Sequence, residues 1–208
     1  SDCTAWNVNG SQHFGAIMNP RYTPLKPRYT QLAFCPRCGS PYRPADFDGA
    51  DVVFRCATCG FHFYQNSIPS GVAVVPKADD PSLVVLLTRA NEPGRGQLAL
   101  PGGLLKYGEP PADGARREAR EEVLLDVDVD RLLMTHLVDY SYQGGGISVL
   151  EVAYLMQPVH ADPAGLTTPE ASAIDWYDVD AIIARPGTFA FSEQIPVLEA
   201  YAALLHRA

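Results

Sequence analysis

The stretch that decides the fold is residues 101–125, which read PGGLLKYGEPPADGARREAREEVLL. Its second half predicts a helix from about 111 to 124, because proline is tolerated in a first helical turn. Glu118, Glu121 and Glu122 follow the spacing i, i+3, i+4, which brings three carboxylates to one side of a helix. Like charges at this spacing destabilise an isolated helix by about a few tenths of a kcal/mol per pair. The cluster therefore indicates either a solvated helix face or a site for cations.

The loop before the helix favours the cation site. Gly102 and Gly103 place backbone without side chains immediately upstream, where a carbonyl oxygen can approach a metal ion and amides can approach a phosphate. Hard divalent cations prefer several oxygen ligands, and a carboxylate cluster that faces a glycine loop supplies them. Such cations bridge phosphoryl oxygens and neutralise the charge that develops during displacement. We therefore expect a Mg²⁺ site that acts on a substrate with adjacent phosphates.

The same residues resemble the signature of the Nudix family. That signature runs Gly, five residues, Glu, seven residues, Arg-Glu, an aliphatic residue, any residue, Glu-Glu, any residue, Gly and an aliphatic residue. The matching positions are Gly103, Glu109, Arg117, Glu118, Ala119, Glu121, Glu122 and Leu125. Leu124 stands where the family has Gly. Because a left-handed backbone at leucine costs about 1–2 kcal/mol, we expect the helix to continue past this position or to end differently.

The resemblance implies roles for the helix and its loop. Glu118, Glu121 and Glu122 would bind Mg²⁺ or Mn²⁺, and the carbonyl oxygen of Gly102 would be an additional ligand. Arg117 would orient the helix carboxylates. Water would then attack one phosphorus of the substrate, and the other phosphate would leave.

Three further carboxylates are candidates for the same site. Glu109 would clamp the loop by pairing with a cation on the helix. The group that takes the proton from water varies among family members and is often a Glu from a later loop. Glu170 is our first candidate for that residue and Glu151 is the second, with a solvated carboxylate as the alternative at both positions.

Four of the five cysteines form two close pairs. Two residues separate Cys35 from Cys38 and Cys56 from Cys59, and 17 residues separate the pairs. This spacing predicts a tetrahedral Zn²⁺ held by four thiolates, with two disulfides or a redox dithiol as alternatives. Four thiolates leave no open coordination position, so this zinc is expected to be structural. His62 then falls outside the ligand set.

The chain divides into three predicted parts: an extended N-terminal arm at 1–33, a zinc ribbon at 34–66 and a Nudix hydrolase domain at 67–208. In the third part, alternating and helical apolar patterns predict strands and helices. The expected strands are 70–75, 83–89, 97–100, 127–142, 147–156 and 173–177, and the expected helices are 111–124, 179–184 and 192–206. The fold class is α/β: a Nudix-type α/β/α sandwich with a mixed sheet, preceded by the small ribbon.

The composition excludes several classes of protein. With 208 residues, 47% of them hydrophobic, the chain can bury a core and is not mainly disordered. A net charge of −8 and a pI near 5.0 oppose binding to nucleic acid. The longest apolar runs, 71–75 and 83–87, are far shorter than the roughly 18 to 20 residues that span a bilayer. Paired cysteines suited to metal indicate a reducing compartment, so we expect a cytoplasmic protein without a membrane partner.

A ribbon followed by a Nudix domain resembles the Nudix hydrolases of NADH, FAD and ADP-ribose. The resemblance implies cleavage of the pyrophosphate bond in a nucleoside diphosphate that is linked to another moiety. NADH-cleaving members carry Ser-Gln-Pro-Trp-Pro-Phe-Pro after the signature, and the nearest text here, FSEQIP at 191–196, is a poor match. Two alternatives stay open, which are a catalytically inactive ligand sensor or regulator on the same fold and a hydrolase of nucleoside triphosphates or RNA caps.

The expected partner is a small nucleotide substrate, and the family resemblance implies that a homodimer can form. The residues that bind the substrate are left unassigned. Four aromatic residues are candidates for stacking on a base, with burial in the core as the alternative for each. They are Tyr140, Tyr142, Tyr154 and Phe191.

Overall fold

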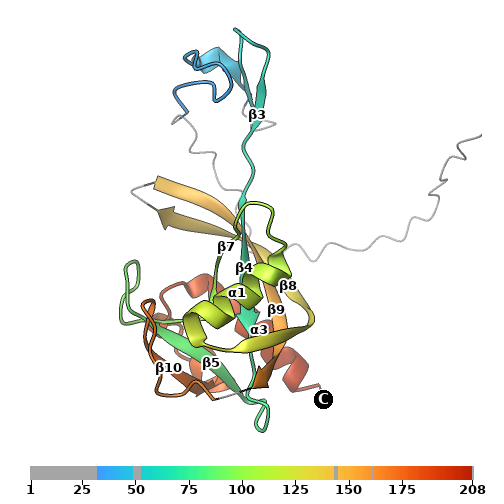
Figure 1. Ribbon diagram of the computed structural model, residues 1–208, viewed down its shortest axis with the longest axis vertical. Coiled ribbons are helices and arrows are strands. Elements are labelled where there is room, and N and C mark those ends of the chain that lie inside the picture. Colours follow the sequence, from blue (N-terminus) through green and yellow to red (C-terminus); the bar gives the residue numbers. More distant parts are fainter. Residues whose placement is uncertain (1–31, 49–52, 143–144, 161, 208) are drawn as a thin grey trace, which may run out of the picture.

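The computed structural model describes residues 32–48, 53–142, 145–160 and 162–207. The predicted arm at 1–33 lies outside these ranges except for its last two residues, and the side chains of Tyr140 and Tyr142 are also outside the description. The described elements form a small sheet at one end and a larger α/β body (Figure 1). Within the described ranges, no helix is long and apolar enough to cross a membrane.

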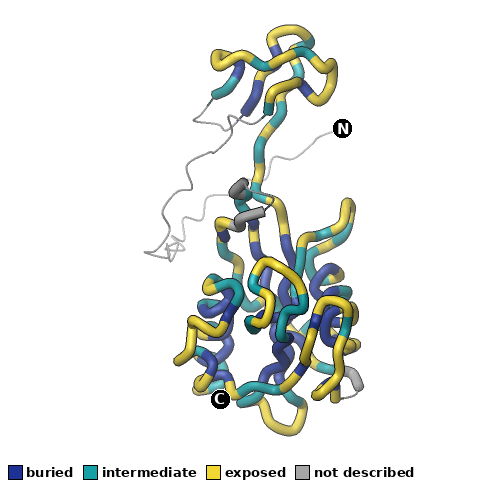
Figure 2. The backbone as a smooth tube through the Cα atoms, turned by 90° about the vertical axis from the view of Figure 1, so that its left-hand side faces the viewer, coloured by how far each residue is buried: buried dark blue, intermediate teal, exposed yellow. Residues whose placement is uncertain are grey.

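The small sheet belongs to the ribbon. Strands β1 (Phe47–Asp48), β2 (Val53–Arg55) and β3 (His62–Tyr64) pair antiparallel in that order, after a single 3₁₀ turn, η1 (Pro44–Asp46). Its interior is small, with Val53, Phe54, Cys35 and Cys56 buried. Figure 2 shows that most of the remaining ribbon backbone belongs to exposed or half-buried residues. So small a core favours additional stabilisation by a metal ion.

The larger body contains two sheets. The first has the strand order β7 (Gly102–Leu104), β4 (Ile68–Val74), β9 (Gly145–His160) and β8 (Asp126–Tyr142). The second has the order β10 (Ala171–Asp178), β5 (Leu83–Arg89) and β6 (Leu98–Ala99). Strands β4 and β9 run parallel and their other neighbours antiparallel, which confirms the predicted mixed sheet. The glycine loop is itself part of the sheet, because β7 pairs with β4.

Helices cover both faces of the sheet. Helix α1 (Pro111–Val123) packs Ala115, Ala119 and Val123 into one core, and α3 (Ile195–Leu205) packs Val197 and Leu198 into the other. The shorter helical elements α2 (Val179–Ile183), η2 (Pro186–Thr188) and η3 (Ser192–Gln194) complete the second layer. The expected α/β/α sandwich is therefore confirmed.

The end of α1 corrects one expectation. The helix stops at Val123, and Leu124 adopts the left-handed conformation with φ 58° and ψ 26°, contrary to the expected path. The reason is the burial on either side, because Val123 and Leu125 are both fully buried while Leu124 is 45% exposed. Burying two large apolar side chains offsets a local backbone cost of about 1–2 kcal/mol.

Candidate active site

Helix α1 presents its three glutamates to unequal environments. Glu118 and Glu122 are 8% and 4% exposed, whereas the side chain of Glu121 is 46% exposed. Burial, assisted by the nearby carboxylates of Glu118 and Glu170, raises the pKa of Glu122 to about 8, against a hydrogen bond from the Gly102 amide. Burial also raises the pKa of Glu118. Two of the three predicted ligands thus lie where negative charge is costly without a cation.

Arg117 connects the loop to the helix carboxylates. Its Nε and Nη2 donate to Glu109 Oε1 and Oε2 at 2.8 and 2.9 Å. Its Nη1 donates to Glu118 Oε1 at 2.7 Å and to Glu121 Oε2 at 2.9 Å. Hydrogen bonds from Arg117 lower the pKa of Glu109 to about 2, assisted by the backbone amide of Lys106. The structure therefore brings Arg117 and Glu109 together as a bidentate ion pair between helix α1 and the loop before it.

Glycine is required where the sheet meets α1. A Cβ on Gly103 would lie 2.5 Å from Glu118 Oε1, and a Cβ on Gly71 would lie 2.6 Å from the carbonyl oxygen of Pro111. The amide of Gly102 donates to Glu122 Oε2 at 2.8 Å. The glycines thus allow β4 and β7 to approach the helix closely enough for its carboxylates to reach the edge of the sheet. Gly71 was not among the residues that the sequence singled out.

A cavity of about 360 Å³ lies beside these groups. Its walls include Glu118, Glu121, Glu122, Gly102 and Gly103 from the signature, together with both candidate proton acceptors, Glu151 and Glu170. Glu109 does not line the cavity and acts on it through Arg117, which does. A volume of this size is within the range of ligand pockets.

Two of the cavity residues were not assigned to the site from the sequence. Arg89 was not considered, and Phe191 was left open between stacking on a base and burial in the core. Arg89, at the end of β5, places its guanidinium carbon 5.0 Å from the centre of the Phe191 ring. Both side chains line the cavity, and Arg89 acts to lower the pKa of Glu122. An arginine that ends an apolar strand was the available signal. Of the aromatic candidates, Phe191 reaches the cavity, whereas Tyr154 packs against the apolar core beneath α1.

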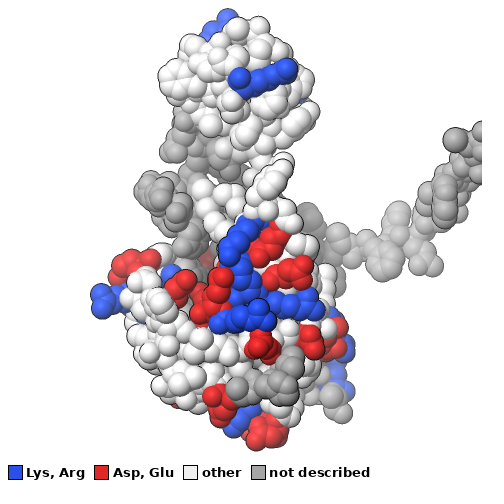
Figure 3. All heavy atoms as spheres, in the orientation of Figure 1, with Lys and Arg blue, Asp and Glu red and all other residues white. Residues whose placement is uncertain are grey.

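The charged groups gather around this region. Figure 3 shows acidic and basic side chains side by side on the face of the body that carries α1, whereas the ribbon is sparsely charged in the same view. The alternation indicates ion pairing, in accord with the contacts of Arg117.

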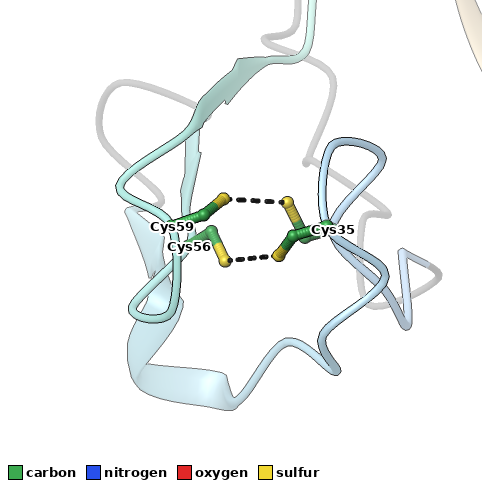
Figure 4. A group of neighbouring side chains, drawn as sticks. Cys35, Cys56 and Cys59 are labelled. Carbon is green, nitrogen blue, oxygen red and sulfur yellow. Dashed lines mark hydrogen bonds between the residues drawn. The ribbon is translucent and has the colours of Figure 1, made fainter.

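The four paired cysteines form a second cluster, in the ribbon. Their sulfur atoms all lie within 4.8 Å of one another, with Cys35 to Cys59 at 3.8 Å and Cys38 to Cys56 at 3.7 Å (Figure 4). Four sulfurs bound at about 2.3 Å to one tetrahedral ion stand about 3.8 Å apart, so the cluster fits Zn²⁺. All four thiols are free, which excludes the disulfide alternative in this structure. His62 is exposed on β3 and outside the cluster.

Comparison with known proteins assigns the family. Residues 68–198 match the family model of the NUDIX domain, so this chain belongs to the Nudix family. The NAD-capped RNA hydrolase NudC of Stutzerimonas stutzeri is 26% identical over 161 residues, which are 76% of this chain and 52% of that protein. The chain therefore spans about half the length of this relative.

Solved structures share the fold. A NUDIX hydrolase from Nitrosomonas europaea has a TM-score of 0.65 and 24% identity, over 85% of this chain and 94% of that one. The NUDIX domain of Shewanella oneidensis NrtR, complexed with ADP ribose, has a TM-score of 0.54 and 19% identity, over 68% of this chain and 90% of that one.

Proposed function

We propose that this chain is a pyrophosphohydrolase that cleaves the diphosphate of a nucleoside linked to a second moiety, of the ADP-ribose, FAD or NADH type. The observation that carries the proposal is the pair of buried carboxylates, Glu118 and Glu122, on the wall of one cavity with the glycines of β7. Arg117 already balances Glu118 through a hydrogen bond of 2.7 Å, whereas the buried Glu122 carboxylate is bonded by the neutral Gly102 amide, so a further cation favours the ionised pair. A polyanionic diphosphate needs that same cation in order to enter so acidic a cavity.

The donor set fits Mg²⁺ or Mn²⁺. Glu118, Glu121 and Glu122 would hold the ions, with the carbonyl oxygen of Gly102 as an additional ligand, because hard cations prefer oxygen donors. When bound, the ions supply neutralisation of phosphoryl charge and a more acidic water.

The protein's own residues would then position the metal-binding carboxylates and take the proton from the attacking water. Arg117, fixed by Glu109, holds Glu118 and Glu121 in place through hydrogen bonds of 2.7 and 2.9 Å. Glu170 lies at the end of a largely exposed loop, just before β10, and lines the cavity. Its carboxylate is therefore our first choice to accept the proton of the attacking water.

The known proteins support the substrate class. NudC is described as a hydrolase of NAD-capped RNA, and the NrtR domain was solved with ADP ribose. Both NAD and ADP-ribose contain a nucleoside diphosphate joined to a second moiety. The candidate substrates are therefore ADP-ribose, FAD and NADH, and NAD-capped RNA represents the RNA-cap alternative, which the net charge of −8 opposes.

The proposal extends to the metal of the ribbon, the domain boundaries and the cellular compartment. We propose structural Zn²⁺ in the ribbon at 34–66, a Nudix domain at 67–208 and, because cysteine pairs with metal-binding spacing are typical of a reducing compartment, a cytoplasmic location. The arm at 1–33 and the homodimer remain predictions.

A substrate panel with a carboxylate variant tests the function. Purified protein is incubated with ADP-ribose, FAD, NADH and NAD-capped RNA in Mg²⁺ or Mn²⁺, and mononucleotide product is measured. Glu122→Gln should lower kcat by about 100-fold or more, because each factor of ten corresponds to about 1.4 kcal/mol of barrier and a lost metal ligand removes several kcal/mol of stabilisation.

Glu199→Gln is the matched control, because Glu199 is exposed on α3 and does not line the cavity. It should retain the activity of the unchanged protein. Unchanged turnover in a folded Glu122→Gln protein would contradict the assignment of this site. Tight binding of every compound without product would instead favour the ligand-sensing alternative.

A further inference from the structure

Three polar side chains form a row across the central sheet. Ser70 in β4 is in register with Glu151 in β9, and Glu151 is in register with His136 in β8. Residues that are in register on neighbouring strands project from the same face of a sheet, so the three side chains lie side by side. None of them belongs to the Nudix signature.

Ser70 and Glu151 are buried and His136 is half-buried, and not all of their polar atoms are hydrogen-bonded. Ser70 is 4% exposed and Glu151 is 9% exposed. Within the described ranges, Ser70 Oγ, Glu151 Oε1 and His136 Nε2 have no hydrogen-bond partner. His136 Nε2 and Glu151 Oε1 lie 3.1 Å apart and form an ion pair when the imidazole is protonated. Buried polar atoms are nearly always satisfied in native proteins, so Ser70 Oγ, which has no partner among the described residues, indicates that a bound polar group completes the row.

The row faces the candidate active site. Ser70 and Glu151 line the same cavity as Glu118 and Glu122, and His136 lines a neighbouring cavity of about 470 Å³. Val138 and Val149, which pair with each other next to the row, also line the active-site cavity. A substrate whose diphosphate lies against α1 would therefore place an attached group against the row.

The chemistry of the row selects that group. A carboxylate accepts hydrogen bonds, a serine hydroxyl both donates and accepts, and flanking valines contact apolar surface. A second phosphate is disfavoured, because it would face the Glu151 carboxylate. Carboxylates bind ribose hydroxyls in other nucleotide sites, where the hydroxyl is the donor. We infer that Ser70 and Glu151 form a subsite for the hydroxyls of a substrate ribose, with His136 as a positioning residue for Glu151.

The inference rests on the proposed function for its substrate class, and it gives Glu151 a different role from that of a proton acceptor. A group that binds substrate and transition state equally changes KM and leaves kcat unchanged, whereas a proton acceptor changes kcat. The two roles are therefore separable by kinetics.

The main test measures binding without depending on turnover. Calorimetry in Ca²⁺, used in place of Mg²⁺, compares ADP-ribose with its analogues that lack the 2′-hydroxyl on the adenosine ribose or on the terminal ribose. The unchanged protein should bind ADP-ribose about 10- to 100-fold more tightly than one of the two analogues. Glu151→Gln should reduce that preference to less than about threefold. Ser70→Ala should reduce it partly without lowering Tm, because it removes a buried hydroxyl that has no partner among the described residues.

Two further variants control the interpretation. Thr135→Ala changes an exposed neighbour in β8 that pairs with Val152 rather than with Glu151, and it should leave the preference intact. His136→Gln keeps a nitrogen donor and should retain the preference, whereas His136→Leu should lose it. In Mg²⁺ kinetics with ADP-ribose, Glu151→Gln should raise KM about 10-fold or more and change kcat by less than about threefold.

The outcomes separate the subsite from the proposed function. Binding of ADP-ribose in Ca²⁺ that depends on the ribose hydroxyl, together with no turnover of ADP-ribose in Mg²⁺, would support the subsite and contradict the proposed function. No binding of ADP-ribose, no preference between it and the two analogues, or a preference that survives Glu151→Gln would overturn the subsite. A fall in kcat at constant KM would also overturn it and return Glu151 to the role of proton acceptor.

Discussion

The ribbon and the signature helix are two candidate metal sites built on different plans. In the ribbon, four identical ligands come from two short turns, and their sulfurs all lie within 4.8 Å of one another, with Cys35–Cys59 at 3.8 Å and Cys38–Cys56 at 3.7 Å. Around α1, the carboxylates differ in burial, and Arg117 already binds two of them. Four thiolates complete a tetrahedral shell, whereas Mg²⁺ is usually bound through a few carboxylates and keeps positions for water and substrate phosphates.

The difference teaches how each site depends on its surroundings. The ribbon cluster needs only its own turns, since its ligands are contributed by residues 35–59. The α1 site needs β7 and the loop that ends at Glu170, which are brought together by the sheet. A change in the ribbon should therefore act on local folding, and a change around α1 should act on chemistry.

The largest expected effect is loss of the proposed zinc site. Cys56→Ser removes a buried thiolate ligand, and structural zinc sites in small domains are worth about 10–16 kcal/mol of apparent binding free energy. The ribbon should therefore lose both its metal and its fold, which elemental analysis and amide hydrogen exchange would report. Hydrolysis of the best substrate should stay within about threefold, and a collapse of kcat would show that the two sites are coupled.

Ala57→Ser is the matched control for the zinc site. It adds the same hydroxyl one residue further along the turn, where the side chain is exposed and supplies no ligand. This variant should keep both its zinc content and its protection from exchange. Zinc retained at full occupancy by Cys56→Ser would contradict the four-thiolate assignment.

A smaller effect is expected at the contact between β7 and α1. Gly103→Ala places a Cβ 2.5 Å from Glu118 Oε1, so the flexible carboxylate must move while the backbone can stay. Misplacement by about 1 Å can cost about 100-fold in rate, so kcat should fall by that order with little change in Tm. Gly187→Ala, at a glycine with open space around it, is the matched control. Equal activity of both variants would remove the steric argument for Gly103.

Loss of the ion pair between Glu109 and Arg117 should lower kcat less than loss of a metal ligand. Glu109→Gln keeps the shape of the side chain but removes the charge that Arg117 binds through two hydrogen bonds. We expect kcat to fall about 10-fold, as for groups that orient metal ligands, and Tm to fall by about 5 °C. Steady-state kinetics and thermal unfolding check this expectation. A variant with normal kcat and lowered Tm would reduce the clamp to a purely structural contact.

The smallest effect is expected at the end of α1. Leu124→Gly should stabilise the protein by about 0.5–1 kcal/mol, because glycine adopts φ 58° without strain and the leucine side chain is already 45% exposed. Leu124→Ala, which keeps the strain and removes the side chain, is the control. Denaturant unfolding measures both, and a loss of stability in the glycine variant would show that Leu124 makes packing contacts that outweigh its backbone cost.

Much of the site could be predicted from the spacing of residues along the sequence alone. Glu118 and Glu122 lie on one helix face because any α-helix puts i and i+4 together, and the two cysteines within each pair are close because they belong to one short turn. The expected path past Leu124 was wrong, because local backbone preference was outweighed by the burial of Val123 and Leu125. Tertiary packing decided that residue.

The sequence by itself determined the family, the two ligand clusters and the α/β order, since all three depend on residues close together in the chain or on periodic patterns. Only the tertiary structure decided which carboxylates are buried, that Arg89 and Phe191 share a cavity wall, and that Ser70, Glu151 and His136 form a row. Those residues come from strands that are distant in sequence. Their proximity follows from strand register, which long-range pairing and burial set together and which no local pattern encodes.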